Sequence, residues 1–152
     1  MQFCGCCRSA KPRIERKYSL PFKRVIELEA AQAAIANDVA ALLSQPCVPM
    51  GAAKPPSSTG VYILTIGDDV MYVGEAKGKK GLKDRLTAKH ISGDDSHAIQ
   101  RAFKMEFPDR SVRREHIKKT VFARWLEISP DHRVSAVERT LIWMFDPPWN
   151  VK

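Results

Sequence analysis

The sequence has no long hydrophobic run and no cysteine after position 47. Its longest apolar stretch, around Val39–Leu43, is far shorter than the roughly 20 residues that cross a membrane, so we expect no membrane span. No early basic residue precedes a long apolar segment, so we expect no secretory signal. Residues 60–152 contain no cysteine and therefore no disulfide framework, which favours a reducing, cytoplasmic environment.

Three of the four cysteines crowd the N-terminus, as Cys4, Cys6 and Cys7. Their spacing is not a usual zinc spacing, and no histidine lies nearby. Lipidation, redox reactivity and an incidental reactive tail are all compatible with this cluster. We predict that residues 1–21 form a basic, cysteine-containing tail.

The chain carries 25 basic and 17 acidic residues, a net charge of +8. The excess concentrates in three stretches, Arg8–Arg24, Lys77–Lys89 and Arg110–Lys119. A basic surface suggests an anionic partner, with nucleic acid first, although a solvated basic face without a partner has the same composition.

The first half of the chain predicts one long helix followed by a linker. Apolar residues recur at three- and four-residue steps over residues 22–43, between Pro21 and Pro46. Residues 45–59 are rich in proline and serine, which is typical of a linker. We expect the helix to pack on the second domain or on a partner, including a second copy of the chain.

The region from Gly60 onward has the pattern of a small α+β domain. Residues 60–66 and 70–73 are typical of the two strands of a hairpin around a Gly67-Asp68-Asp69 turn. Helices are expected at 82–90, from about Ser96 to Pro108 with Asp95 or Ser96 as its cap, and from Ser129-Pro130 to Pro147. With a strand at 120–128, the order is ββααβα, around a three-stranded antiparallel sheet.

Glu138 is the most informative single residue. On a helix, it neighbours Val134, Leu141 and Ile142, which should face the core. Burying a carboxylate is costly unless it is paired, protonated or bound to a metal. The sequence is compatible with a Mg²⁺-type cation, with a salt bridge to an arginine, or with an edge position that reaches solvent.

Two tyrosines and an arginine give weaker signals. Tyr62 and Tyr72 lie on adjacent strands of the hairpin, each close to a glycine that lets another group approach. Arg85 follows the basic loop on a helix, and a guanidinium matches phosphate oxygens. An ordinary tyrosine pair and an exposed helical arginine explain the same residues.

Together these residues resemble the signature of the GIY-YIG nuclease superfamily. Gly60-Val61-Tyr62 is followed, after nine residues, by Tyr72-Val73-Gly74, and then by Arg85, Glu138 and Asn150 in the order of that family. The resemblance covers residues 60–152. The chain departs from the family at Glu75 and in a longer loop around Gly78-Lys79-Lys80-Gly81.

The resemblance implies hydrolysis of a DNA phosphodiester with one divalent metal, Mg²⁺ or Mn²⁺. It assigns Tyr62 as the general base, Tyr72 as a positioning residue, Arg85 to the transition state and Glu138 to the metal. Lys77, His90 and Asn150 are expected to support the site. Backbone phosphates are expected to contact a set of basic side chains: Lys79, Lys80, Lys83, Lys89, Arg113 and Arg114.

The sequence therefore predicts a DNA endonuclease. Two alternatives stay open: a nucleic-acid-binding module without catalysis, and a nuclease subunit that depends on a partner, with residues 22–43 as the contact.

Overall fold

The computed structural model describes the backbone of residues 22–93, 95 and 97–150. The predicted tail at residues 1–21, with Cys4, Cys6 and Cys7, lies outside the described residues. No helix in the described part of the chain is long and apolar enough to cross a membrane.

A four-stranded antiparallel sheet forms the middle of the fold, in the order β1-β4-β2-β3. The strands are β1 (Val48–Pro49), β2 (Gly60–Ile66), β3 (Asp69–Ala76) and β4 (Phe122–Glu127). The predicted hairpin is confirmed, because β2 pairs with β3 from Gly60 opposite Ala76 to Ile66 opposite Asp69. The three-stranded sheet is corrected, because the two residues of β1 pair with β4 and add a fourth strand.

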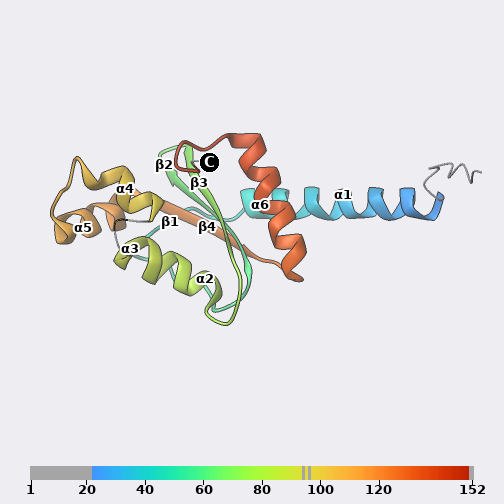
Figure 1. Ribbon diagram of the computed structural model, residues 1–152, viewed down its shortest axis with the longest axis horizontal. Helices are drawn as coiled ribbons and strands as arrows, with labels where there is room; N and C mark the ends of the chain where they lie inside the picture. The colour runs from blue at the N-terminus through green and yellow to red at the C-terminus, as the bar shows by residue number, and fades with distance from the viewer. Residues whose placement is uncertain (1–21, 94, 96, 151–152) are drawn as a thin grey trace, which may run out of the picture.

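Helices cover both faces of the sheet (Figure 1). One face carries a continuous helical segment made of α2 (Gly81–Lys83), the π-helical η1 (Asp84–Lys89) and α3 (His90–Ser92), followed by α4 (Ala98–Lys104) and α5 (Arg110–Thr120). The other face carries α1 (Phe22–Leu43) and α6 (Asp131–Phe145). The sequence did not predict α5, so the ββααβα order is one helix short.

The alternation of β2 divides its side chains between two cores. Tyr62 and Leu64 pack with the helices of the α2–α5 face, whereas Val61 and Ile63 pack with α1 and α6. Successive side chains of a strand point to opposite faces, and both faces are covered here. Because β2 is buried on both sides, the position of each residue along the strand determines in which of the two cores its side chain lies.

The helix boundaries differ locally from the prediction. Asp109 caps α5 by accepting hydrogen bonds from the backbone of Ser111 and Val112. The second predicted helix begins at Ala98, and its N-cap is His97 without a capping side chain. Asp95 does not cap it and instead pairs with basic side chains of α4 and α5. The last helix likewise starts one residue late, with Pro130 as its N-cap.

The proline-rich segment is packed against the domain, which corrects its description as a plain linker. It supplies strand β1 and the side chain of Met50, which is buried in the core on the α2–α5 face. Backbone hydrogen bonds join Met50 to Val121 and Gly51 to Lys118. This segment therefore connects α1 to the sheet at a fixed position.

Only the C-terminal half of α1 packs on the domain. Leu42 and Val39 are buried against α6, whereas Leu28 is 53% exposed and the start of the helix projects beyond the domain (Figure 1). The expected self-association or partner contact through residues 22–43 stays a prediction.

We predict that Leu42→Ala lowers the free energy of unfolding by about 2–5 kcal/mol, because it leaves a cavity in a fully buried position. Leu28→Ala on the same helix is the matched control, and we expect a change within about 0.5 kcal/mol. Urea denaturation at a protein concentration that keeps the chain monomeric measures both. Equal losses in the two variants would contradict the division of α1 described above.

Candidate active site

The two tyrosines of the hairpin converge over a single glycine. The ring centroids of Tyr62 and Tyr72 are 6.1 Å apart. A Cβ placed on Gly74 would overlap the Tyr62 hydroxyl oxygen and would lie 2.7 Å from Cε1 of Tyr72. Any side chain at position 74 would therefore displace both phenols, which explains why glycine follows Val73.

Tyr62 is held by His90. Its hydroxyl lies 2.7 Å from Nε2 of His90, and both side chains are almost completely buried. Burial, followed by the neighbouring Tyr72, raises the pKa of Tyr62 well above its ordinary value, while Arg85 acts in the opposite direction. The protein in its free state therefore keeps Tyr62 as a neutral phenol.

Burial also keeps His90 neutral. It lowers the pKa of His90 from 6.5 to about 3, and the nearby His97 and Arg85 add to this effect. The other ring nitrogen, Nδ1, is buried without a hydrogen-bond partner among the described residues. The sequence placed His90 among the supporting residues without identifying its contact with Tyr62.

A π-helical turn places His90 relative to Arg85. The backbone N–H of His90 donates to the carbonyl of Arg85, five residues earlier, so this turn holds one residue more than an α-helical turn. Arg85 is exposed, and its charge acts on both phenols. One short segment thus positions a buried imidazole and an exposed guanidinium.

A buried polar network fixes the backbone at His90. The side-chain amide of Gln100 donates to the carbonyls of His90 and Ile91, at 2.8 and 3.0 Å. Arg113 donates through Nε to Gln100 at 2.9 Å and through Nη2 to Asp95 at 2.7 Å. Arg113 therefore ties α5 and α4 to the turn that carries His90.

This position corrects the expected role of Arg113. Its side chain is only 1% exposed, so it does not reach a phosphate backbone. The remaining basic residues expected to contact phosphates are at the surface: Lys79, Lys80, Lys83 and Lys89 are exposed, and Arg114 is half-buried with a hydrogen bond to the carbonyl of Ser92.

Glu138 approaches the phenols from the other layer of the fold. It lies on α6, half-buried, beside the edge strand β3. Among the described residues, no lysine, arginine or histidine lies within 4 Å of its carboxylate, so the salt-bridge alternative is not supported there. Partial burial raises the pKa of Glu138 and the carboxylate of Glu75 raises it further, against the smaller lowering effects of a backbone hydrogen bond from Glu75 and of the Lys77 and Arg139 charges.

Glu75 and Lys77 form a small cluster beside Glu138. Lys77 lies 2.9 Å from the Glu75 carboxylate and also donates to the hydroxyl of Ser135, which in turn donates to Glu75 at 2.7 Å. Burial alone would raise the pKa of Glu75, but these hydrogen bonds and the Lys77 charge lower it. The ammonium of Lys77 therefore forms an ion pair with Glu75, a contact that the sequence did not predict.

Asn150 closes the open edge of the sheet. Its side-chain amide accepts from the backbone N–H of Val73 at 2.8 Å and donates to the carbonyl of the same residue at 2.7 Å. The backbone N–H of Trp149 donates to Met71. These contacts satisfy outer backbone groups of β3 next to Tyr72, so Asn150 holds the edge strand, and its support of the site stays a prediction.

The described residues contain no group of three or more histidine, cysteine, aspartate or glutamate side chains that could enclose a metal ion. A site for one Mg²⁺ does not need such a group, because this ion keeps several waters and binds through one or two carboxylates. Glu138 fits that description, since it is half-buried, has no cationic partner among the described residues and lies near a second carboxylate.

We predict that the stability of the protein falls as the pH is lowered from about 6.5, because the unfolded chain binds a proton at His90 that the folded protein excludes. This one group contributes up to about 1.4 kcal/mol per pH unit to the slope. Urea titrations between pH 7 and 5 should show a flatter dependence for His90→Gln. The exposed His132→Gln is the control, and an unchanged slope in His90→Gln would contradict the prediction.

We also predict that Arg113→Ala lowers the free energy of unfolding by about 3–5 kcal/mol, because it leaves buried polar partners without their contacts. Arg114→Ala, one position along α5, should cost less than about 1 kcal/mol. Comparable losses for both arginines in chemical denaturation would overturn the structural role of Arg113.

Comparisons with known proteins give a distant structural likeness. No protein-family model matches the sequence, and no curated protein matches it significantly. The chain is structurally similar, at low sequence identity, to GIY-YIG endonuclease domains. One is the N-terminal domain of UvrC from Thermotoga maritima, as a point mutant bound to its catalytic divalent cation, with TM-score 0.44, 19% identity and 68% and 91% of the two chains covered.

The same UvrC domain bound to magnesium gives a TM-score of 0.39 with 20% identity, and covers 67% of this chain and 91% of its own. A mutant of bacteriophage T4 EndoII gives 0.42 with 18% identity, and covers 66% of this chain and 80% of its own.

Proposed function

We propose that this protein is a metal-dependent endonuclease that hydrolyses DNA phosphodiester bonds. The observation that carries the proposal is the half-buried carboxylate of Glu138, which has no cationic partner among the described residues and lies near two converging phenols and an exposed guanidinium. Half-buried carboxylates without a direct cationic partner are uncommon unless they bind a ligand. The motif order in the sequence supports the same reading.

Each residue has a distinct task in the proposed reaction. Arg85 is exposed and free to contact the non-bridging oxygens of the scissile phosphate, where negative charge develops. Glu138 would hold one Mg²⁺ or Mn²⁺, which would supply positive charge to stabilise the departing 3′-oxygen. Tyr72 is partly exposed beside Tyr62 and would orient the attacking water.

The hydrogen bond to His90 defines a route for the proton. Tyr62 cannot take a proton from water while it keeps its own, and its raised pKa opposes loss of that proton to solvent. We infer that the phenol passes its proton to Nε2 of His90 as it accepts one from the attacking water. The positive charge of Arg85 favours phenolate at Tyr62 but opposes a proton on His90, so the transfer requires the negative charge of the bound substrate to offset this effect at His90.

Surface lysines would supply affinity without sequence information. Lys79, Lys80 and Lys83 line one shallow pocket beside the loop, and Lys89 is exposed further along the same segment. Contacts from such side chains to phosphates position a duplex and make binding weaker in high salt.

The test is nicking of supercoiled plasmid in Mg²⁺ or Mn²⁺. We expect the wild-type protein to nick, and Glu138→Gln, Tyr62→Phe and Arg85→Ala to lose roughly 10²–10³-fold in rate, as removal of an electrostatic catalytic contact does elsewhere. Binding of the same DNA should survive in all three. The exposed Glu106→Gln serves as a charge-matched control and should cut at the wild-type rate.

The other outcomes are informative. A wild-type protein that binds DNA but does not cut plasmid, branched or single-stranded substrates would replace this proposal with a non-catalytic nucleic-acid-binding module. The complete burial of Tyr62 is the observation that favours that second reading. Cutting that persists in Glu138→Gln would remove Glu138 as the metal ligand.

A further inference from the structure

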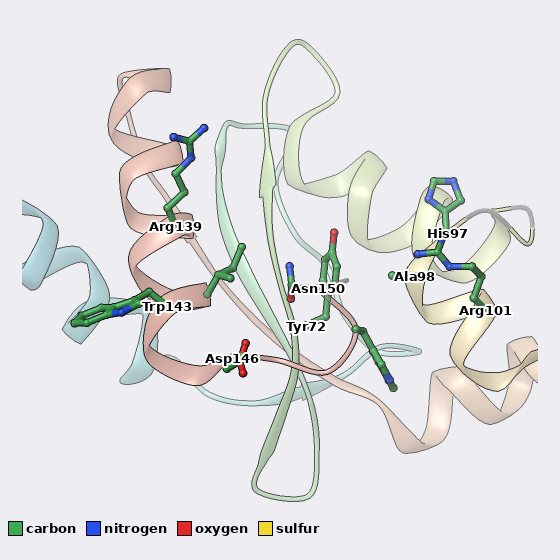
Figure 2. Close-up of a pocket in the computed structure, with 10 residues that line it drawn as sticks. Tyr72, His97, Ala98, Arg101, Arg139, Trp143, Asp146 and Asn150 are labelled. Atoms are coloured by element: carbon green, nitrogen blue, oxygen red, sulfur yellow. The ribbon is translucent and has the colours of Figure 1, made fainter. Parts of the chain in front are cut away.

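A groove of about 820 Å³ extends from Tyr72, between α4 and α6 (Figure 2). His97 and Arg101 lie along its α4 side, and Arg139 lies along its α6 side. Arg101 lies close enough to Tyr72 for its charge to lower the pKa of that phenol against the larger effect of burial. The groove is therefore continuous with the candidate active site, and the site itself does not use it.

The groove offers positive charge that is available to a ligand. Neither Arg101 nor Arg139 lies within 4 Å of a carboxylate among the residues that the structure describes. Both side chains are exposed, and in Figure 2 they extend from opposite sides of the opening. Asp146 is the single acidic side chain of the lining, so the lining carries net positive charge.

The groove also has an aromatic wall. Trp149 lines it and is fixed from behind by an edge contact with Phe103, with ring centroids 5.6 Å apart, and by the hydrogen bond from its backbone to Met71. Trp143 is 83% exposed at the rim, but its side chain points away from Tyr72 in Figure 2. A ligand inside the groove would therefore meet the ring of Trp149, in addition to that of Tyr72 where the groove joins the candidate site.

We propose that this groove binds an unpaired nucleotide of the strand that the site cuts, with its base against Trp149 and its phosphates beside Arg101 and Arg139. The inference rests on the proposed function and names its substrate class as DNA with an unpaired segment. Positive surface charge alone would be enough to bind the phosphates of a paired duplex. A ligand-sized hollow with an aromatic wall matches a base whose face is free, because the bases of a duplex are already stacked.

The experiment measures binding in the Glu138→Gln background, so that cutting does not interfere. Three DNA probes share one sequence: a fully paired duplex, the same duplex with a short unpaired branch, and the branched form with abasic sites in the branch. We expect the branched probe to bind about tenfold more tightly than the paired one, and the abasic probe to lose most of that gain.

Variants of the groove should reduce the preference for the branch. Arg101→Ala and Trp149→Leu are expected to bring the affinity ratio of branched to paired DNA close to one. Arg101 is exposed, so its replacement tests the groove even if Trp149→Leu destabilises the fold. Lys119→Ala, which removes one exposed charge from α5 outside the groove, should weaken both probes equally and leave the ratio unchanged.

Two results would overturn the inference. One is equal affinity for the branched and the paired probe. The other is an abasic branched probe that binds as tightly as the intact branched probe, because the preference would then come from phosphate contacts and not from a base. Nicking by the unmutated protein is measured separately. Nicking without a preference for the branch removes this inference and leaves the nuclease proposal standing. A base-dependent preference without nicking supports the groove and removes the nuclease proposal.

Discussion

The burial of strand β2 on both faces is the constraint on which the candidate site depends. The side chains of β2 alternate between two covered faces, so Tyr62 points into the layer of α2–α5. There its hydroxyl forms a hydrogen bond with His90. Glu138 belongs to the opposite layer, with α1 and α6. Side chains of the two layers come close to each other beside the edge strand β3, where Glu138 lies near Tyr62 and Tyr72.

The electrostatics of the site follow from the same geometry. Tyr62 and His90, the two candidate-site residues enclosed in the α2–α5 layer, are uncharged in the free protein: the phenol has a raised pKa and the imidazole a lowered one. The charged groups lie toward solvent, with Arg85 on one side of β3 and the carboxylates of Glu75 and Glu138 on the other. A polyanionic ligand that approached this edge would meet the guanidinium directly, and would meet the carboxylates only with a cation between them.

The sequence predicted the parts of the fold that have strong local patterns. Strand β2 and the hairpin could be read from two short apolar segments around a Gly-Asp-Asp turn, and α6 from its Ser129-Pro130 start and the prolines that follow it. Strand β1 could not, because two residues, one of them a proline, carry no periodicity and are set by pairing with β4. Helix α5 was missed because its charged residues outnumber its apolar ones, so its basic run suggested a phosphate-binding surface.

A usable signal for Arg113 was nevertheless present. Arg113 lies four residues before Ile117, on the same stripe of α5, and that stripe faces the core. His90 likewise continues the four-residue spacing of Leu82 and Leu86, both buried, which indicated that it points inward. What no local pattern could supply was the identity of the partners, since Asp95, Gln100 and Tyr62 meet these residues only through tertiary contacts.

The π-helical turn between Arg85 and His90 makes the site sensitive to chain length as well as to residue identity. Successive residues of a helix are rotated by about 100°, so removing one residue from this turn would rotate His90 away from Tyr62 while Arg85 stayed in place. Every residue of the motif would still be present in such a chain. Homologous sequences that keep the motif but differ in length between these two residues should therefore be regarded as having a different site.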